Sequence, residues 1–199
     1  MIYEMDQLPP AKRYNLLASL VTPRPIAWIT TIDEEGRINA APFSFFNVFG
    51  SNPPIVAFAP GNKDRETPKD TARNIRRTGE FVVHMVDEPL AQMMVDTSAS
   101  LPHGESELDK LPLTTVPSEN LSVPRIVEAP VALECSEHTT LEIGSNRLII
   151  GVVHVVHARD GLFDDDIHLY HGAYQPIGRM SSPDWYTRTT EQFEIPRPD

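Results

Sequence analysis

The stretch Thr22–Asn47 (TPRPIAWITTIDEEGRINAAPFSFFN) constrains the fold of this chain more than any other. Prolines lie on both sides of Arg24, and because each proline disfavours helical geometry in the residue before it, the entry to the stretch is extended. The composition of Ile26–Thr31 favours a strand with both faces buried. The Asp33–Gly36 segment then predicts a tight turn whose final glycine can take positive φ. We therefore expect two adjacent antiparallel strands.

Small, polar and aromatic residues follow one another at the end of this stretch: Ala41, Pro42, Phe43, Ser44, Phe45, Phe46 and Asn47. The small residues leave room above the sheet. Hydroxyl, amide and backbone donors then lie beside flat apolar surface, a combination that suits a planar, phosphorylated ligand. Alternation along the chain sends Phe43 and Phe45 to one side and Phe46 to the other, so at least one of the three belongs to the core.

Composition narrows the class of protein. The chain has 199 residues, enough for one domain with a substantial core. Nineteen prolines against ten glycines favour many loops and short elements over a bundle of long helices. A net charge of −11 argues against a surface for nucleic acid or anionic membranes, and leaves room only for a local basic pocket. The one cysteine, Cys135, excludes an internal disulfide and is best interpreted as a buried thiol.

Short elements are expected along the whole chain, which we treat as a single domain of residues 1–199. Helices are predicted at Pro10–Leu20, at Leu90–Val95, and after an N-cap at Thr67 with Pro68 at the first helical position and Gly79 at the end. Further strands are predicted at Ile55–Ala59, Glu80–Val86, Val131–His138 and Arg147–Arg159, with a shorter Ile167–Tyr170 segment closing the sheet. This succession indicates a mainly β fold with short helices, in which closure into a barrel removes exposed strand edges.

Residues Ser98–Pro124 form the longest irregular part of the chain. Pro102, Gly104, Pro112 and Pro117 interrupt any helical or strand period. An irregular segment of this length in a compact domain is either disordered or functional, for example as a lid or as an arm that contacts a dimer partner. Its leucines indicate that it packs against something.

Short motifs occur along the chain in a definite order: PRPIAW (23–28), NAAPFSFFN (39–47), NPP (52–54), KDT (69–71) with NI (74–75), GEFVV (79–83) and PIGR (176–179). In order and spacing they resemble the flavin reductase-like family, whose domain is an FMN-binding split β-barrel. The resemblance covers roughly residues 15–185, and the series is far more specific than any single motif. One position departs from the pattern, because His84 stands where the family usually has asparagine.

The resemblance implies an FMN site. A phosphate needs donors and positive charge, and Arg24, Ser44, Lys69 and Thr71 offer both, the last two in the first turn of a predicted helix. By resemblance, the KDT turn and the APFSFFN loop hold the phosphate and the edge of the flavin ring. The expected FMN-binding residues are Arg24, Ala41, Pro42, Ser44, Phe45, Phe46, Asn47, Lys69, Thr71 and His84.

Several of these residues also have a purely structural interpretation. Arg24 as a surface charge and Thr71 as an ordinary first-turn residue are the alternatives at the phosphate end. His84 shares a strand face with apolar residues, so a hydrogen-bonded core histidine and a neighbour of the flavin both remain open. No metal site is expected, because His154 and His157 are three residues apart on a strand and point to opposite faces.

The resemblance implies a flavin reductase-type oxidoreductase with tightly bound FMN, which takes electrons from NAD(P)H and passes them to flavin or another acceptor. Hydride transfer itself needs no general acid or base, so no catalytic residue is named. The sequence has no dinucleotide-binding fingerprint, so NAD(P)H is expected to dock transiently. The alternatives are an FMN-carrying electron-transfer or flavin-handling module without nicotinamide activity, and a split-barrel flavin oxidase or oxygenase acting on a small molecule.

A cytoplasmic homodimer is expected. The apolar Leu148–Val156 strand and the leucine-bearing arm together exceed what one small barrel easily buries. The resemblance places the flavin near a dimer interface, where residues Ser98–Glu107 would approach the partner's cofactor. No apolar run reaches the roughly 20 residues of a membrane span, and the acidic start of the sequence does not resemble a signal peptide.

Overall fold

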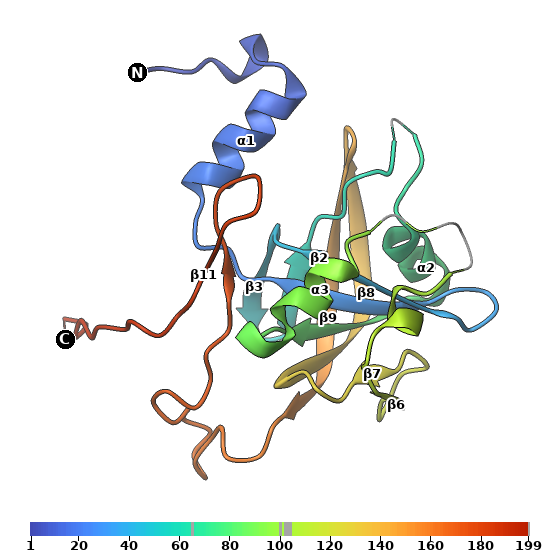
Figure 1. The fold of residues 1–199 in the computed structure, drawn as a ribbon, viewed down its shortest axis with the longest axis vertical. Coiled ribbons are helices and arrows are strands. Elements are labelled where there is room, and N and C mark those ends of the chain that lie inside the picture. The colour runs from blue at the N-terminus through green and yellow to red at the C-terminus, as the bar shows by residue number, and fades with distance from the viewer. Residues whose placement is uncertain (65, 100, 102–104, 199) are drawn as a thin grey trace.

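The computed structural model describes residues 1–64, 66–99, 101 and 105–198, so Pro102 and Gly104 of the predicted arm lie outside the described residues. One antiparallel sheet of seven strands carries the fold (Figure 1). In spatial order its strands are β2 (Ile38–Phe43), β1 (Ala27–Ile32), β5 (Glu80–Met85), β8 (Val131–Ile143), β9 (Asn146–Ala158), β4 (Pro54–Phe58) and β3 (Phe46–Ser51).

The two edges of this sheet, β2 and β3, are consecutive in the sequence. Only Ser44 and Phe45 link them, and the three Cα steps across this link span at most about 11 Å. The sheet must therefore curl until its edges approach each other at this link, which we call the β2–β3 corner. Among the described strand pairs, β2 and β3 do not hydrogen-bond to each other. The expected full closure is thus wrong, and the barrel is split at the corner.

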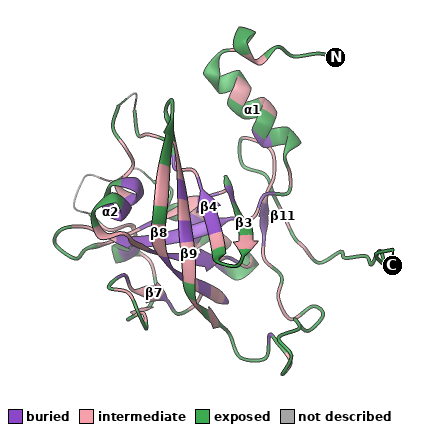
Figure 2. Ribbon diagram, turned by 180° about the vertical axis from the view of Figure 1, so that it is seen from behind, coloured by how far each residue is buried: buried purple, intermediate pink, exposed green. Residues whose placement is uncertain are grey.

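Short helices and two-stranded ribbons complete the fold. The helices are α1 (Pro10–Leu20), α2 (Asp70–Thr78) and α3 (Ala91–Asp96), with 3-10 turns η1 (Met5–Gln7), η2 (Glu88–Leu90) and η3 (Glu107–Lys110). The ribbons pair β6 (Thr115–Val116) with β7 (Arg125–Ile126), and β10 (Gly178–Arg179) with β11 (Tyr186–Thr187). Helix α1 has the predicted bounds, stands apart from the sheet and is mostly exposed (Figure 2). Within the described ranges, no helix is long and apolar enough to cross a membrane.

Helix α2 begins later than predicted. The Asp64 carboxylate accepts the backbone N–H groups of Glu66 and Thr67, and these bonds hold the segment before the helix in a turn. The N–H of Lys63 donates to the carbonyl of Thr67 over 2.8 Å, and Pro68 forms a β-bridge with Asn62, so this segment is extended and Thr67 is not the N-cap. The helix starts at Asp70, and Lys69 is its N-cap residue rather than part of its first turn.

Two predictions about strands are also corrected. The loop expected after β2 is a strand, since Phe46–Ser51 pairs with β4. Its aromatic content is consistent with strand preference. The Ile167–Tyr170 segment does not close the sheet, because Ile167 takes a φ of 63°, which is outside the extended region.

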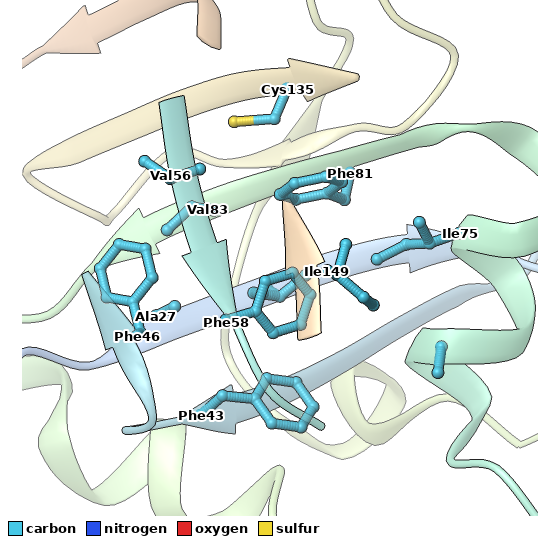
Figure 3. Packing of buried hydrophobic residues seen from close by; sticks show 12 residues of the cluster. Ala27, Phe43, Phe46, Val56, Phe58, Ile75, Phe81, Val83, Cys135 and Ile149 are labelled. Atoms are coloured by element: carbon cyan, nitrogen blue, oxygen red, sulfur yellow. The ribbon is translucent and has the colours of Figure 1, made fainter. Parts of the chain in front are cut away.

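The inside of the curled sheet is filled by aliphatic and aromatic side chains (Figure 3). The ring of Phe58 contacts those of Phe43 and Phe81, with centroid distances of 5.3 and 5.5 Å. A β-carbon at Gly151 of β9 would lie 2.4 Å from the Phe81 ring, so this close approach requires glycine. Ile75 brings the apolar face of α2 onto this core.

Strand β1 is buried on both faces, as predicted. Ala27 and Ile29 belong to the core inside the barrel, whereas Ile26 and Trp28 belong to a second core on the opposite face. This alternation follows the period of two along a strand. The second core extends to α3, where Met94 is buried.

The described part of the arm packs against the protein's own sheet. Leu108 of η3 is buried in the second core. The Ser106 hydroxyl donates a hydrogen bond to the carbonyl of Ile38 over 2.5 Å, and the Glu107 carboxylate accepts the N–H of Ala40 over 3.0 Å. The arm therefore covers the free edge of β2, one of the ways in which proteins protect exposed strand edges.

His84 is a core histidine of β5. Its side chain is fully buried, and its Nε2 atom accepts the N–H of Ile126 over 2.9 Å. The proton must then be on Nδ1, which donates to the carbonyl of Trp28 over 3.0 Å. Burial lowers the pKa of His84 to about 4, and the hydrogen bond to Trp28 only partly offsets this effect.

This neutral histidine predicts a specific pH dependence of stability. A folded-state pKa of about 4 lies below the unfolded value of 6.5, so the unfolded state binds the proton more tightly. The free energy of unfolding should therefore fall as the pH is lowered from about 6.5 to about 4, by roughly 3 kcal/mol from this group alone. Urea unfolding of wild type and His84→Asn at several pH values across this window measures the effect.

The variant removes the titrating group, so its stability should fall less steeply over this window than that of wild type. His171→Asn replaces an exposed histidine and serves as the matched control, with a slope equal to that of wild type. Identical slopes for wild type and His84→Asn would show that His84 is not held neutral by the fold.

Candidate functional site

A cavity of about 430 Å³ opens beside the β2–β3 corner. Its volume lies within the range of small-molecule sites. The walls come from α1, the end of β2, the loop after β4, α3 and the β10–β11 ribbon, and Lys69 enters from the start of α2. Segments far apart in the sequence thus meet at the place where the barrel is split.

The buried side chain of Arg24 connects this corner to neighbouring segments by hydrogen bonds. Its side chain is 6% exposed, and its Nε donates a hydrogen bond to the Ser44 hydroxyl over 3.3 Å. Its other donors bind the carbonyl oxygens of Ala18 and Val21 at the end of α1, and that of Met180 after β10. Burial lowers the pKa of Arg24. Arg24 is therefore not the surface charge of the structural alternative, and it does not itself line the cavity.

Ser44 and Phe45 present the corner to the cavity. The Ser44 hydroxyl accepts from Arg24 and has no protein acceptor for its own hydrogen in the described part of the chain. Phe45 is 41% exposed, lines the cavity, and lies 5.9 Å from the ring of Tyr14, centroid to centroid. The corner thus combines a hydroxyl donor that has no protein acceptor with an aromatic wall.

The other residues of the predicted loop point elsewhere. Phe46 is buried in the core, and Asn47 is exposed with its Oδ1 atom accepting the N–H of Val48 over 2.8 Å. Phe43 lies mainly in the core and contributes only an edge to the cavity. At least one of the three phenylalanines is core, as predicted. The predicted alternation is wrong because β2 ends at Phe43 and the corner intervenes before β3 begins.

Lys69 is a partly buried cation that makes no ion pair within the described residues. Its Nζ atom lies 5.5 Å from the centroid of the Phe43 ring. Burial lowers the pKa of Lys69, with a smaller contribution from nearby Lys63. Lys63 differs in this respect, since it forms an ion pair with Asp70. An ammonium that faces a cavity and has no counter-ion in the described part of the chain is the arrangement expected of an anion site.

A smaller pocket of about 70 Å³ adjoins the cavity and shares Pro42, Lys69 and Ser98 with it. Ala41 and Thr71 line this side pocket. The hydroxyl of Thr71 accepts a hydrogen bond from the side chain of Asn39 over 3.0 Å. These two predicted residues, Ala41 and Thr71, therefore line the side pocket and not the cavity itself.

His84 lies outside both hollows, because its two ring nitrogens are used by Trp28 and Ile126 within the core. Of its two open interpretations, the structure supports the hydrogen-bonded core histidine.

The residues present fit a planar ligand with a phosphate. Phosphate recognition needs cations and hydrogen-bond donors, which Lys69 and Ser44 supply. A flat aromatic ligand needs an apolar wall, which Pro42, Phe45 and Met94 supply. The donors and the wall meet in one cavity, so a single ligand can use both.

Tyr14, Arg179 and Tyr186 are among the cavity residues that were not predicted from the sequence. Arg179 belongs to the PIGR motif, although the motif alone indicates no role for it. Tyr14 has no local signal, because its contact with Phe45 depends on how α1 lies against the corner.

Solved structures of other proteins share this fold. Nitrilotriacetate monooxygenase component B from Bacillus cereus is 32% identical, with a TM-score of 0.93 and coverage of 98% of each chain. The 2-nitrobenzoate 2-nitroreductase NbaA of Pseudomonas fluorescens is 33% identical, with a TM-score of 0.90 over 100% of this chain and 96% of that chain. A protein from Shewanella frigidimarina with a split barrel domain is 20% identical, with a TM-score of 0.83 and full coverage of both chains. The last likeness confirms the split-barrel fold.

The family is shown by the sequence as a whole. Residues 19–178 match the family model described as flavin reductase like domain. The match runs from within α1 to the first residue of β10, and so includes the sheet, the β2–β3 corner and Lys69. The chain therefore belongs to the flavin reductase-like family.

Proposed function

We propose that this protein is an FMN-dependent oxidoreductase of the flavin reductase type, which takes electrons from NAD(P)H and passes them to flavin or another acceptor. The observation that carries the proposal is Lys69, a partly buried cation in the cavity of a flavin reductase-like domain, with no counter-ion among the residues that the structure describes. Burying a charge is unfavourable unless something compensates for it. A phosphorylated cofactor is the compensation that the family suggests.

The roles of the residues follow from their chemistry. The Lys69 ammonium and the Ser44 hydroxyl would hold the FMN phosphate, and Arg24 would orient Ser44. Pro42 and Phe45 would flank the ring and exclude water from it. Bound FMN would supply the redox chemistry by accepting a hydride and passing electrons onward. No general acid or base is required from the protein for the hydride step.

The acceptor is open between two classes. The similar Bacillus cereus protein is a monooxygenase component, which supports delivery of electrons to a second enzyme. The similar Pseudomonas fluorescens protein is a nitroreductase, which supports direct reduction of a small aromatic molecule as the second candidate. Both candidates use the same cavity and the same cofactor.

The proposed working form is a cytoplasmic homodimer. Val48 and Phe49 on the open edge strand β3 are 62% and 65% exposed. Apolar residues on an unprotected edge favour association with another chain. Light scattering measures the mass of the protein in solution and so distinguishes a dimer from a monomer.

The phosphate assignment predicts a selective effect of Lys69→Met. The variant keeps an apolar stem but removes the charge, so the Kd for FMN should rise at least about tenfold, as expected for the loss of one charge-assisted hydrogen bond. The Kd for riboflavin, which has no phosphate, should not change. Fluorescence quenching measures both constants.

Lys110→Met removes an exposed lysine of η3 and serves as the control, with both constants unchanged. The ligand-free Lys69→Met protein should unfold at the same temperature as wild type or slightly higher, because a desolvated charge has been removed. Equal losses of FMN and riboflavin affinity, or a lower unfolding temperature, would contradict the phosphate site.

The reaction is tested by mixing FMN-loaded protein with NADH or NADPH in the absence of oxygen. The visible absorbance of the flavin should bleach in a saturable reaction. Transfer of electrons to added free FMN is then followed by the loss of free-flavin fluorescence, because oxidised flavin only moves from one site to the other, whereas transfer to 2-nitrobenzoate is followed by the return of the flavin absorbance. Faster transfer to free flavin supports the flavin reductase, and faster transfer to the nitro compound supports the second candidate. A flavin that stays oxidised with both nicotinamides would contradict the proposal and leave the electron-transfer module and the flavin oxidase or oxygenase.

A further inference from the structure

The cavity contains a second cationic side chain, on a different wall from Lys69. Arg179 lines the cavity from β10, whereas Lys69 precedes α2. In Figures 1 and 2, α2 and β11 lie at opposite ends of the sheet. A ligand phosphate held by Lys69 therefore leaves Arg179 available to a different anionic group.

The backbones of Arg179 and Arg24 hydrogen-bond to each other, but their side chains differ in the number of hydrogen bonds that they make. The N–H of each residue donates to the carbonyl of the other, over 2.9 Å from Arg24 and 2.8 Å from Arg179. Among the described residues, Arg24 binds four protein oxygens, whereas Arg179 donates only to the carbonyl of Pro183. A guanidinium has five N–H donors, so most of those on Arg179 have no acceptor in the described part of the protein.

The orientation of the Arg179 side chain is fixed by Tyr186. The two residues are directly opposed in the β10–β11 ribbon, and the Arg179 Cζ atom lies 4.6 Å from the centroid of the Tyr186 ring. Stacking of this kind holds the guanidinium in one plane without using its donors. A guanidinium held in this way loses little side-chain entropy when it binds an anion in a two-pronged geometry.

The charges around Arg179 favour an anion. Its positive charge contributes to lowering the pKa of Arg24, so the two guanidinium groups are close enough to repel each other. Among the described residues, no carboxylate forms an ion pair with Arg179. The one acidic side chain that the described lining contributes is Asp184, which is exposed in the link between β10 and β11.

We propose that Arg179 is a specificity-determining residue that binds a phosphate of the nicotinamide dinucleotide, the electron donor. This inference rests on the proposed function, in which the FMN phosphate occupies Lys69 and Ser44. Because the chain has no dinucleotide-binding fingerprint, a side chain must recognise the phosphates of the donor. Arg179 is the remaining cation on the described wall of the cavity. Asp184 then acts in the opposite direction, by repelling the same group.

The test is the reductive half-reaction of FMN-loaded protein, followed by stopped-flow absorbance while the concentration of NADH is varied. Arg179→Gln should raise the apparent Kd for NADH at least about tenfold, while the limiting rate stays within about twofold and the Kd for FMN within about threefold. Asp184→Asn should lower the apparent Kd for NADH. Arg188→Gln is the control, because Arg188 follows β11 and pairs with Glu88 outside the cavity, and it should change neither value.

Arg179→Lys keeps the charge but not the planar fork, so it should give an intermediate Kd even if Arg179→Gln fails to fold. If NADH reduces the wild type and both Arg179 variants have the wild-type apparent Kd for NADH, the inference is overturned and the proposed function is not. A loss of FMN affinity in Arg179→Gln as large as in Lys69→Met would also overturn it, by making Arg179 an FMN ligand. Wild type that binds FMN but is not reduced by either nicotinamide would instead overturn the proposed function, and the inference with it.

Discussion

Arg24 donates hydrogen bonds to three separate parts of the chain: the end of α1, the hydroxyl of Ser44, and the carbonyl of Met180 beyond β10. Hydrogen bonds to a charged group contribute about 1.5–3 kcal/mol each, and a buried charge that loses them is strongly destabilising. The guanidinium therefore makes the positions of these segments depend on one another. Helix α1 and the β10–β11 ribbon form walls of the cavity because the Arg24 guanidinium holds both of them next to the corner.

The corner itself is a consequence of sheet topology. Strands β2 and β3 are joined by two residues but lie at opposite ends of the strand order, so the sheet must curl, and its two edge strands do not pair with each other in the described sheet. An open edge normally needs protection, and the arm supplies it for β2 through Ser106 and Glu107. The cavity lies beside the corner where these two edges meet. The split in the barrel thus coincides with the proposed cofactor site.

The charge distribution supports an anionic ligand in that opening. The chain has a net charge of −11, yet Lys69 and Arg179 face the cavity without ion-pair partners in its described part. Lys63, a short distance along the chain from Lys69, is neutralised by Asp70. Two cavity cations without ion-pair partners among the described residues concentrate the positive potential of an acidic protein where a ligand can use it.

Much of the fold is predictable from local sequence patterns. Helix α1 has its predicted bounds, and the apolar run at Ile26–Ile29 correctly indicates a strand buried on both faces. The start of α2 is not predictable in this way, because Thr67 and Pro68 pair with Lys63 and Asn62 across a turn, and a capping rule does not include that pairing.

The site is harder to predict than the fold. Ser44 and Phe45 face the cavity, whereas Phe46 and Asn47 of the same motif do not line it. Which member of a motif turns inward depends on where a strand ends, and that is set by pairing with distant strands. Tyr14 and Tyr186 reach the cavity only through tertiary contacts, so no local pattern marks them.

Arg24 couples α1, the corner and the β10–β11 ribbon. Hydrogen–deuterium exchange of the Arg24→Lys variant tests this coupling. Lysine keeps the charge but not the fork of five donors, so the fold should survive while the coupling weakens. We expect faster exchange in all three segments together, with β5 unchanged as the internal reference. Faster exchange in only one of the three segments, or in none, would show that Arg24 does not couple them.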